Sequence, residues 1–477
     1  MRTRRRVLYG ILAVVGLVVA GIVVPLARTA TATPQSPTLK FNNVPLLLNN
    51  VGSSEPEIAI GNSGTMAMVS LQWLFDPNAY GTHLWTGPFG ATPTHQGIVD
   101  NSLQQPGKQV FGAGDADVDI GSTGALHIST LVFLENPTFN GSQLGVSAIS
   151  CPRVPTSGFA IPPCTAQLIG TTNADRQWVT SDGKQVYISF HDAADASLID
   201  VMRSDDDGLT WKKVADPVVG QGGTTGQTTF NNIQGKLVAD PFSHNVYDIY
   251  AAGETGVLKG TTFTPNNIIV SRSSDMGQSW TANVAFSAPA GTSLSDIFPA
   301  LAVDPTTGTL YAVWSDGHNI SLASSTDQGA TWTPAVQVSS APAATTAVLP
   351  WVAAYHGTVD VVYYGTTSSS NLDPSAQWNV FFAQPNGSGG FTQTQVNTGK
   401  LSPNHIGVIC TGGTGCTSGT RNLLDLFQIA IDPQNGKAAI IYVNDTLQTS
   451  TDSNNFACLP NQAPPCPLPQ AVLAQQN

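Results

Sequence analysis

Two places in the sequence set an aspartate close to an arginine, and these pairs are the best candidates for acid–base chemistry. Asp175 is followed directly by Arg176, and Arg421 stands four residues before Asp425. A carboxyl group can act as a general acid or base, while a guanidinium can orient an anionic or hydroxylated ligand. The alternative is structural, because an aspartate beside an arginine at the start of a strand often forms a local ion pair that fixes the loop.

Further polar and aromatic side chains near strand ends are candidate ligand-binding residues: Glu57, Asp117, Trp178, His191, Asp192, Asp296, Asp316 and His405. Structural roles compete here too. His191 and Asp192 can cap a strand, and His405 can be a packed, hydrogen-bonded residue rather than a general base. Carboxylate oxygens suit Ca²⁺, although the chain has no EF-hand-like loop, so a metal remains open and no other cofactor is expected.

Three segments share the spelling Ser-x-Asp-x-Gly-x-Ser/Thr-Trp, at residues 204–211, 273–280 and 325–332. The Asp side chain accepts N–H groups of its own turn, Gly takes a positive φ, and Trp packs beneath the turn. These turns explain the aspartates without a catalytic or calcium-binding role, which is the alternative. The predicted structural residues are Asp206, Gly208, Trp211, Asp275, Gly277, Trp280, Asp327, Gly329 and Trp332.

The elements that position these residues form a repeat with a period of about sixty residues. Each repeat has a polar opening, an apolar strand, a turn rich in Gly, Asn, Asp or Pro, and a second strand rich in β-branched and aromatic residues. The repeats begin at Glu55, Asp115, Asp175, Gln234, Asp296, Val348 and Asp425. In the fifth repeat, strands are predicted at residues 300–303, 309–314, 320–324 and 335–338.

Four antiparallel strands make one propeller blade, and each small sheet must be covered by its neighbours. We therefore predict an all-β fold, a single β-propeller over residues 55–457, with seven blades and six as the alternative. The last blade is short, so residues 39–48, within a linker at 33–54, are predicted to supply its outer strand and close the ring. Residues 458–477, rich in Pro and Gln, are predicted to form a tail.

The amino terminus is predicted to be an export signal over residues 1–32. Four arginines among the first six residues precede an apolar run at residues 7–27. The triplet at residues 30–32 offers a cleavage site, yet the apolar run is also about long enough to span a bilayer as an uncleaved helical anchor. The protein is therefore expected to be secreted or extracytoplasmic, with membrane contact only through this segment.

The cysteines and the net charge further restrict the class of protein. Six cysteines form three local pairs, Cys151 with Cys164, Cys410 with Cys416 and Cys458 with Cys466, which in an exported chain predict disulfides. A metal site is the alternative, but the spacing is not that of a zinc site. The formal net charge of -12 disfavours binding to nucleic acid. Neither feature indicates an oligomeric state.

The repeated Ser-x-Asp-x-Gly-x-Ser/Thr-Trp hairpin resembles the Asp-box, or bacterial neuraminidase repeat, of the sialidase superfamily. Residues 175–178, 298–304 and 405–407 resemble segments of exported bacterial proteins described as sialidase-like. The resemblance covers residues 55–445 and implies a β-propeller in which the Asp-boxes join the third and fourth strands of a blade. It also implies a ligand site on the opposite face, where the loops enter the first strand and leave the second.

A standard sialidase mechanism is not expected. It needs three arginines, a tyrosine nucleophile with a glutamate partner, and an acid–base aspartate. After the leader the arginines are Arg153, Arg176, Arg203, Arg272 and Arg421, and only Arg176 and Arg421 occupy the expected ligand face. Glutamates are scarce, so neither Tyr363 nor Tyr364 has an obvious partner.

Three functions follow as hypotheses. The first is binding of a glycan or another polar ligand at the face opposite the Asp-boxes. The second is an exo-sialidase-like glycoside hydrolase acting on extracellular glycans, with Asp175 or Asp425 as the acid–base group. The third is a purely structural or adhesive surface protein. The sequence leaves open whether the chain is an enzyme.

Overall fold

The computed structural model describes residues 39–48, 52–72, 81–100, 103, 109–112, 114–135, 142–170, 174–192, 198–218, 232–253, 264–294, 296–411, 422–450 and 465–477. All of them belong to one compact unit, Leu39–Asn477. The signal helix predicted at residues 1–32 lies outside this set. A search of the described residues finds no helix with the length and apolarity that crossing a membrane requires.

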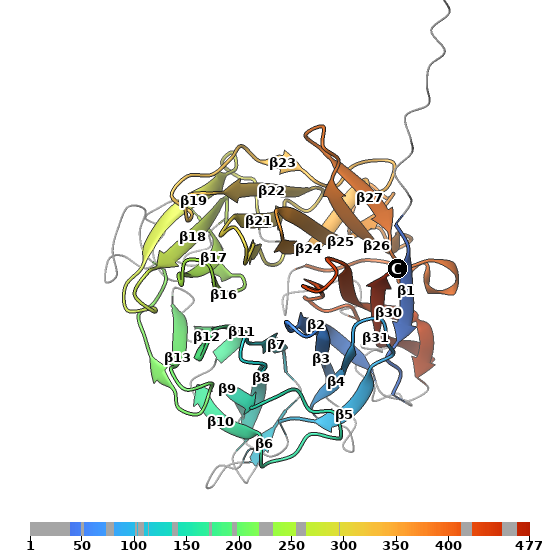
Figure 1. Cartoon of the computed structure of the whole chain (residues 1–477). Coiled ribbons are helices and arrows are strands. Elements are labelled where there is room, and N and C mark those ends of the chain that lie inside the picture. The colour runs from blue at the N-terminus through green and yellow to red at the C-terminus, as the bar shows by residue number, and fades with distance from the viewer. Residues whose placement is uncertain are drawn as a thin grey trace, which may run out of the picture. The chain divides into compact units, whose positions relative to one another are not determined.

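Seven antiparallel sheets surround a common axis, and we number them as blades 1 to 7 in chain order (Figure 1). Blade 1 contains β2 (Ser53–Ile60), β3 (Thr65–Gln72), β4 (Thr82–Pro88) and β5 (Thr94–Ile98). Blade 2 contains β6 (Gln109–Phe111), β7 (Ala116–Ile120), β8 (Leu126–Glu135), β9 (Ser142–Cys151) and β10 (Thr165–Gly170). Blade 3 contains β11 (Ala174–Asp182), β12 (Gln185–Asp192), β13 (Ile199–Ser204) and β14 (Lys212–Lys213).

The second half repeats this plan. Blade 4 contains β15 (Asn232–Gln234), β16 (Val238–Ala239), β17 (Val246–Ala252), β18 (Asn267–Ser273) and β19 (Thr281–Ser287). Blade 5 contains β20 (Ala300–Val303), β21 (Leu310–Ser315), β22 (Ile320–Ser325) and β23 (Val336–Gln337). Blade 6 contains β24 (Thr346–Tyr355), β25 (Thr358–Thr366), β26 (Gln377–Pro385), β27 (Phe391–Gln395) and β28 (His405–Ile406), with a 3₁₀ turn, η1 (Gly399–Leu401), after β27. Blade 7 contains β29 (Gln428–Ile431), β30 (Ala438–Ser450), β31 (Cys466–Gln476) and β1 (Phe41–Pro45).

The ring closes because each innermost strand packs against the next. β2 contacts β7, β7 contacts β11, and the series runs on through β16, β20, β24 and β29 back to β2. Apolar side chains fill the space between adjacent sheets, as Met68 and Trp85 of blade 1 do against Ile441 and Leu473 of blade 7. This confirms the predicted all-β propeller of four-stranded blades, with seven blades, and the six-bladed alternative is wrong.

Blade 7 joins the two ends of the propeller. Its strand order is β1-β31-β30-β29, so residues 41–45 form its outer strand. The prediction of a tail at residues 458–477 is wrong, because residues 466–476 form β31, and the propeller therefore extends past residue 457. The Gln475 side chain, which suggested an irregular tail, accepts the N–H of Gly90 and donates to the Ala91 carbonyl in blade 1.

The three Ser-x-Asp-x-Gly-x-Ser/Thr-Trp hairpins have one geometry, each following the third strand of its blade. In blade 3, Asp206 accepts the N–H of Thr210 at 2.8 Å and its hydroxyl at 2.7 Å. Asp275 and Asp327 accept the same two groups of Ser279 and Thr331. The glycine has a positive φ in each turn, 83°, 82° and 79° in chain order.

We expect Asp275→Ala to lower the free energy of unfolding by about 1–2 kcal/mol, because the turn loses acceptors for two donors of Ser279. Urea denaturation followed by circular dichroism measures the change. Ser274→Ala, an exposed change in the same turn, is the matched control and should have almost no effect. Equal stability of the two variants would contradict a structural role for this aspartate.

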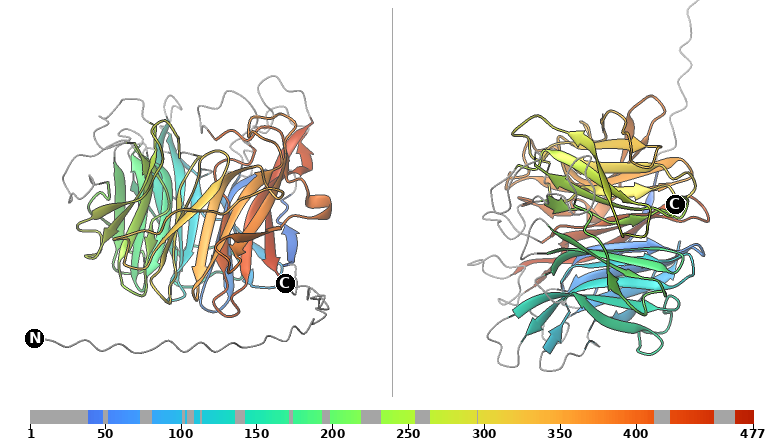
Figure 2. Two further views of the ribbon diagram at one scale, coloured as in Figure 1. Left: turned by 90° about the horizontal axis from the view of Figure 1, so that it is seen from above. Right: turned by 90° about the vertical axis from the view of Figure 1, so that its left-hand side faces the viewer.

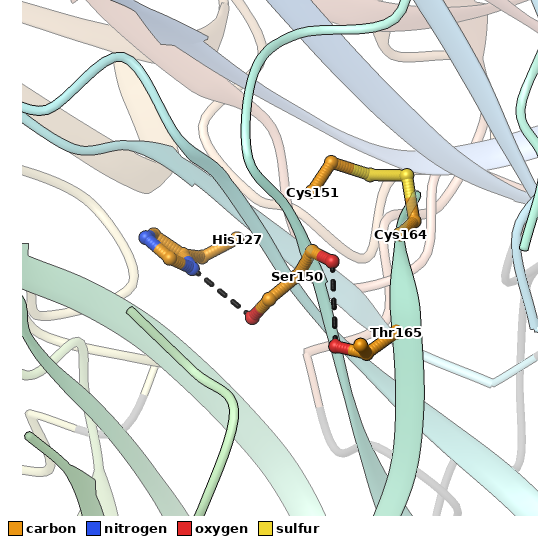
Figure 3. The surroundings of a disulfide bond; sticks show 5 residues. All are labelled: His127, Ser150, Cys151, Cys164 and Thr165. Atoms are coloured by element: carbon orange, nitrogen blue, oxygen red, sulfur yellow. Dashed lines mark hydrogen bonds between the residues drawn. A yellow bond between two sulfur atoms is a disulfide. The ribbon is translucent and has the colours of Figure 1, made fainter. Parts of the chain in front are cut away.

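The loop between β9 and β10 carries a disulfide, Cys151–Cys164, which confirms one predicted pair (Figure 3). Ser150, beside it, bonds to His127 Nδ1 through its hydroxyl and to the Thr165 hydroxyl through its carbonyl. Cys410 and Cys466 are also disulfide-bonded. Their predicted partners, Cys416 and Cys458, lie outside the described residues. Disulfides persist in oxidising surroundings, so this bond is consistent with an extracytoplasmic protein.

Candidate functional site

One face of the ring gathers the loops that lead into the innermost strands, and we call this face the mouth. Successive strands of a blade run in opposite directions, so the loop into the first strand and the loop after the second strand lie on the same face. The hairpin after the third strand lies on the other face. The three Asp-containing hairpins therefore lie opposite the mouth, and the edge-on views show the two faces separated by the length of the strands (Figure 2).

Five charged residues meet in the mouth: Glu55, Asp115, Asp175, Arg176 and Asp425. The Arg176 guanidinium lies 3.5 Å from the Asp175 carboxylate, and these side chains are 25% and 37% exposed. Glu55 accepts the N–H of Asp425 at 3.1 Å, which ties blade 1 to the loop that enters blade 7. The structure therefore brings three predicted residues, Asp175, Arg176 and Asp425, into one electrostatic group.

Asp115 is the proton-binding member of this group. Burial, and then the neighbouring Asp175, raises the pKa of Asp115 to about 6, against the lowering effects of Glu55 and Arg176. At a pH just below 6 the Asp115 carboxyl therefore carries a proton beside the Asp175 carboxyl. Two carboxyl groups in different environments can serve as an acid and a base in one reaction.

Aromatic rings lie directly under Arg176. The Arg176 guanidinium carbon is 4.5 Å from the centre of the Phe298 ring, a cation–π contact. Trp178 packs against Phe298 at 5.9 Å and against Trp351 at 5.4 Å between ring centres. These residues come from blade 3, the loop into blade 5 and blade 6, so they meet across the propeller axis. A small recess above them is lined by Phe298, Leu349, Pro350, Trp351, Asp425 and Phe427.

An irregularity at the start of the innermost strand recurs in several blades. The pairing register shifts between Ser54 and Glu57, between Asp175 and Trp178, and between Val348 and Trp351. Each shift contains a non-glycine residue of positive φ: Glu55, Arg176 or Leu349. Such bulges turn a side chain out of the regular pattern in which successive side chains point to opposite faces of the sheet. In blades 1 and 3 the turned side chain is charged, which places Glu55 and Arg176 in the mouth.

A second charged layer, buried deeper along the innermost strands, contains Glu57, Asp117 and Lys236. The Lys236 ammonium lies 2.7 Å from Asp117, which also accepts the side chain of Gln428 and the N–H of Val179. Burial, and then Asp117, raises the pKa of Glu57 well above its usual value. Burial lowers the pKa of Lys236, but Asp117 and Glu57 outweigh it and the pKa is raised. Glu57 and Asp117 are therefore both buried, with Asp117 as the ion-pair partner of Lys236 and Glu57 as a carboxyl that keeps its proton.

The remaining predicted residues are spread over several blades. His191 is the cross-strand neighbour of Asp175, and Asp192 that of Ala174. Asp296 accepts the Ser315 hydroxyl at 3.3 Å.

Two others are held by local bonds. Asp316 accepts the N–H groups of His318 and Asn319 in its own turn. His405 is buried and bonds to Asp445 at 2.8 Å. Arg421 lies outside the described residues. Within the described ranges, no three His, Cys, Asp or Glu side chains form a group able to hold a metal ion.

Sequence reasoning missed the aromatic support and the buried lysine. Phe298 begins the sialidase-like segment at residues 298–304 but carried no predicted role. Its contact with Arg176 joins two non-adjacent blades. Lys236 follows the start of the fourth repeat, where a lysine is usually solvated. A lysine at the start of an apolar strand is the local sequence signal that could have identified Lys236 as buried.

Comparisons with known proteins give no family. No protein-family profile matches the sequence, and no curated protein matches it. Among solved structures, the GH93 α-L-arabinofuranosidase of Fusarium graminearum is 11% identical with a TM-score of 0.44, over 92% of this chain and 98% of that chain. Aleuria aurantia lectin is 13% identical with a TM-score of 0.42, over 74% and 97%. Trypanosoma rangeli sialidase is 13% identical with a TM-score of 0.41, over 72% and 58%. Similarities of this size assign neither a family nor a ligand to the chain.

Proposed function

We propose that the mouth binds a glycan or another polyhydroxylated ligand through Asp175 and Arg176. The observation that carries this proposal is an exposed ion pair held on a rigid aromatic base. Phe298 and Trp178 fix the guanidinium plane of Arg176, while a quarter of the Arg176 side chain stays open to solvent. A guanidinium donates to two ligand oxygens and the adjacent carboxylate accepts a ligand hydroxyl, a pairing that suits neighbouring hydroxyl groups.

Binding should depend on both members of this ion pair. On a glycan array followed by isothermal titration with the best ligand, we expect Arg176→Gln and Asp175→Asn each to weaken binding by about tenfold or more. Asp182→Asn is the matched control, since Asp182 ends the same strand, β11, on the opposite face. Unchanged affinity in both mouth variants would contradict the proposal.

Hydrolysis of a glycosidic bond is the second candidate, favoured by the protonated Asp115 beside Asp175. In this function Asp115 donates a proton to the leaving oxygen and Asp175 acts on the other side as base or nucleophile. A panel of 4-methylumbelliferyl glycosides tests it. Turnover should fall as pH rises above about 6, where Asp115 loses its proton, and should vanish in Asp115→Asn. Ligand binding without turnover of any glycoside in the panel would exclude hydrolysis and leave glycan binding as the function of the mouth.

The wider context is also part of the proposal. We infer that the chain is an exported sialidase-like protein, that its three hairpins are Asp-boxes, and that residues 1–32 direct export. The leader supports export by its arginines and apolar run. If neither glycan binding nor turnover is found, a structural or adhesive surface protein is the remaining function. Appearance of the protein in culture medium or in a membrane fraction distinguishes a cleaved leader from an anchor.

A further inference from the structure

A groove lies on the face opposite the mouth, where blades 1 and 2 meet. Its walls are the β2–β3 turn, the β7–β8 turn and the loop that follows β9. The groove has a volume of about 370 Å³, which is within the usual range for a small-molecule site. Because it lies on the other face of the ring, it is separate from the mouth.

Both turns in the lining leave backbone N–H groups without an acceptor among the described residues. They are closed in the same way, by bonds from the Gly64 N–H to the Gly61 carbonyl and from the Gly124 N–H to the Gly121 carbonyl, both 2.9 Å. The N–H groups of the residues between these glycines have no acceptor in the described part of the chain: Asn62, Ser63, Ser122 and Thr123. Turns with several outward N–H groups form concave sites for anions.

Arg153 is the charged side chain in the lining of the groove. It is exposed, and it forms no ion pair with any described residue. Carboxylates also contact the lining: Asp207 accepts the Thr123 hydroxyl at 3.3 Å, and Asp119 accepts a hydrogen bond from the Ile120 backbone. An anion is therefore attracted to the Arg153 side of the groove and repelled from the Asp207 side.

The loop that carries Arg153 is fixed at two places. The Cys151–Cys164 disulfide joins its ends. Its middle is bonded to blade 1, where Gln96 accepts the N–H groups of Gly158 at 2.7 Å and Phe159 at 2.8 Å. A fixed loop loses little conformational entropy when the arginine binds a ligand. The backbone of the Arg153 loop is thus fixed beside the groove before any ligand arrives.

We propose that this groove binds a sulfate or phosphate monoester, with Arg153 and the turn N–H groups as donors to its oxygens. The lining offers one full positive charge and the N–H groups of two turns, which suit a compact tetrahedral oxyanion. Sulfate esters occur on polysaccharides and phosphate esters on many small molecules, so the shared chemistry is the ester oxyanion. The site lies on the opposite face from Asp175 and Arg176 and does not depend on the function of the mouth.

Isothermal titration of the purified full-length chain with three matched sugars tests the proposal: N-acetylglucosamine 6-sulfate, N-acetylglucosamine 6-phosphate and unmodified N-acetylglucosamine. We expect binding of at least one ester and none of the unmodified sugar at this site, with weaker binding as salt increases. Arg153→Gln should weaken ester binding by about ten- to a hundredfold. Arg272→Gln removes a positive charge elsewhere on the surface and should leave it unchanged.

Each outcome either supports or contradicts the proposed oxyanion site. Binding of the sulfate alone indicates a sulfated glycan as the ligand, binding of the phosphate alone a phosphate ester, and binding of both an unselective oxyanion site. Retention of ester binding in the mouth variant Arg176→Gln supports a separate site, whereas its loss would place the ligand in the mouth. The proposal is wrong if neither ester binds the wild type up to about 10 mM, or if Arg153→Gln, with unchanged thermal melting, binds like the wild type.

Discussion

The free energy of unfolding is expected to fall as pH rises above about 4, with Asp248 as a principal cause. Asp248 is fully buried in β17, and neither carboxylate oxygen has a hydrogen-bond partner among the described residues. Burial, and then Asp216, raises the pKa of Asp248 well above its usual value. Burial also raises the pKa of Asp216 to about 7.

The direction of this pH dependence follows from the pKa of each carboxyl group in the folded and in the unfolded chain. An aspartate in the unfolded chain loses its proton near pH ~3.9, while these folded carboxyls keep theirs to higher pH. Their stabilising contribution is complete below the unfolded pKa and is lost as pH rises through the folded pKa. In that window each group lowers the free energy of unfolding by about 1.4 kcal/mol per pH unit.

Asp248→Asn tests this directly, because the amide has nearly the same shape and does not titrate. In urea denaturation from pH 4 to 9, the variant should match the wild type at pH 4 and exceed it by about 2 kcal/mol or more at pH 8. Asp327→Asn is the control. The Thr331 hydrogen bonds lower the pKa of Asp327 to about 2, so its loss should leave the slope above pH 5 unchanged. A wild-type slope in Asp248→Asn would show that Asp248 is not responsible.

Trp178→Ala is expected to cost about 3–5 kcal/mol of unfolding free energy. The Trp178 side chain is 1% exposed and packs against rings from two other blades, so its removal leaves a cavity near the axis. Phe298 then loses its support, and Arg176 loses its fixed orientation. We therefore expect weaker ligand binding at the mouth in addition to lower stability, with Trp178→Phe intermediate in both.

Trp211→Ala separates these two effects. Trp211 belongs to the same blade but lies in the hairpin on the opposite face, where its indole N–H donates to the Gly208 carbonyl. This control should lower the urea midpoint and leave ligand affinity unchanged. The Trp178 prediction would be refuted by a folded Trp178→Ala protein that has wild-type stability and binds ligand with wild-type affinity.

The fold could be predicted because each blade repeats its pattern locally. In the fifth repeat, the predicted strand at 300–303 is β20 itself, that at 309–314 is shifted by one residue from β21, and that at 320–324 is one residue shorter than β22. The strand at residues 466–476 was missed because one of its two partners, β1, comes from the distant amino-terminal end, although the other, β30, directly precedes it in the sequence. The sequence pattern likewise does not indicate that the innermost strands of blades 2 and 4 are each divided into two short strands.

The site could be predicted only in part. Strand starts place Asp175, Arg176 and Asp425 on one face, and a period of about sixty residues is enough to find such positions. It does not reveal that Arg176 reaches the Phe298 ring from a non-adjacent blade, or that Lys236 is buried against Asp117. Those contacts depend on the width of the ring at its axis. The positive φ of Arg176, which turns its side chain into the mouth, is also invisible in the sequence pattern.

The closure in blade 7 has a consequence for biosynthesis. Among the described strands, β1 pairs with β31 alone, and β31 follows every other strand of the propeller in the sequence. During translation the six preceding blades can assemble in turn, yet β1 has no partner until residue 476 has left the ribosome. An unfinished chain therefore keeps exposed strand edges, which can pair with other chains until β31 is in place.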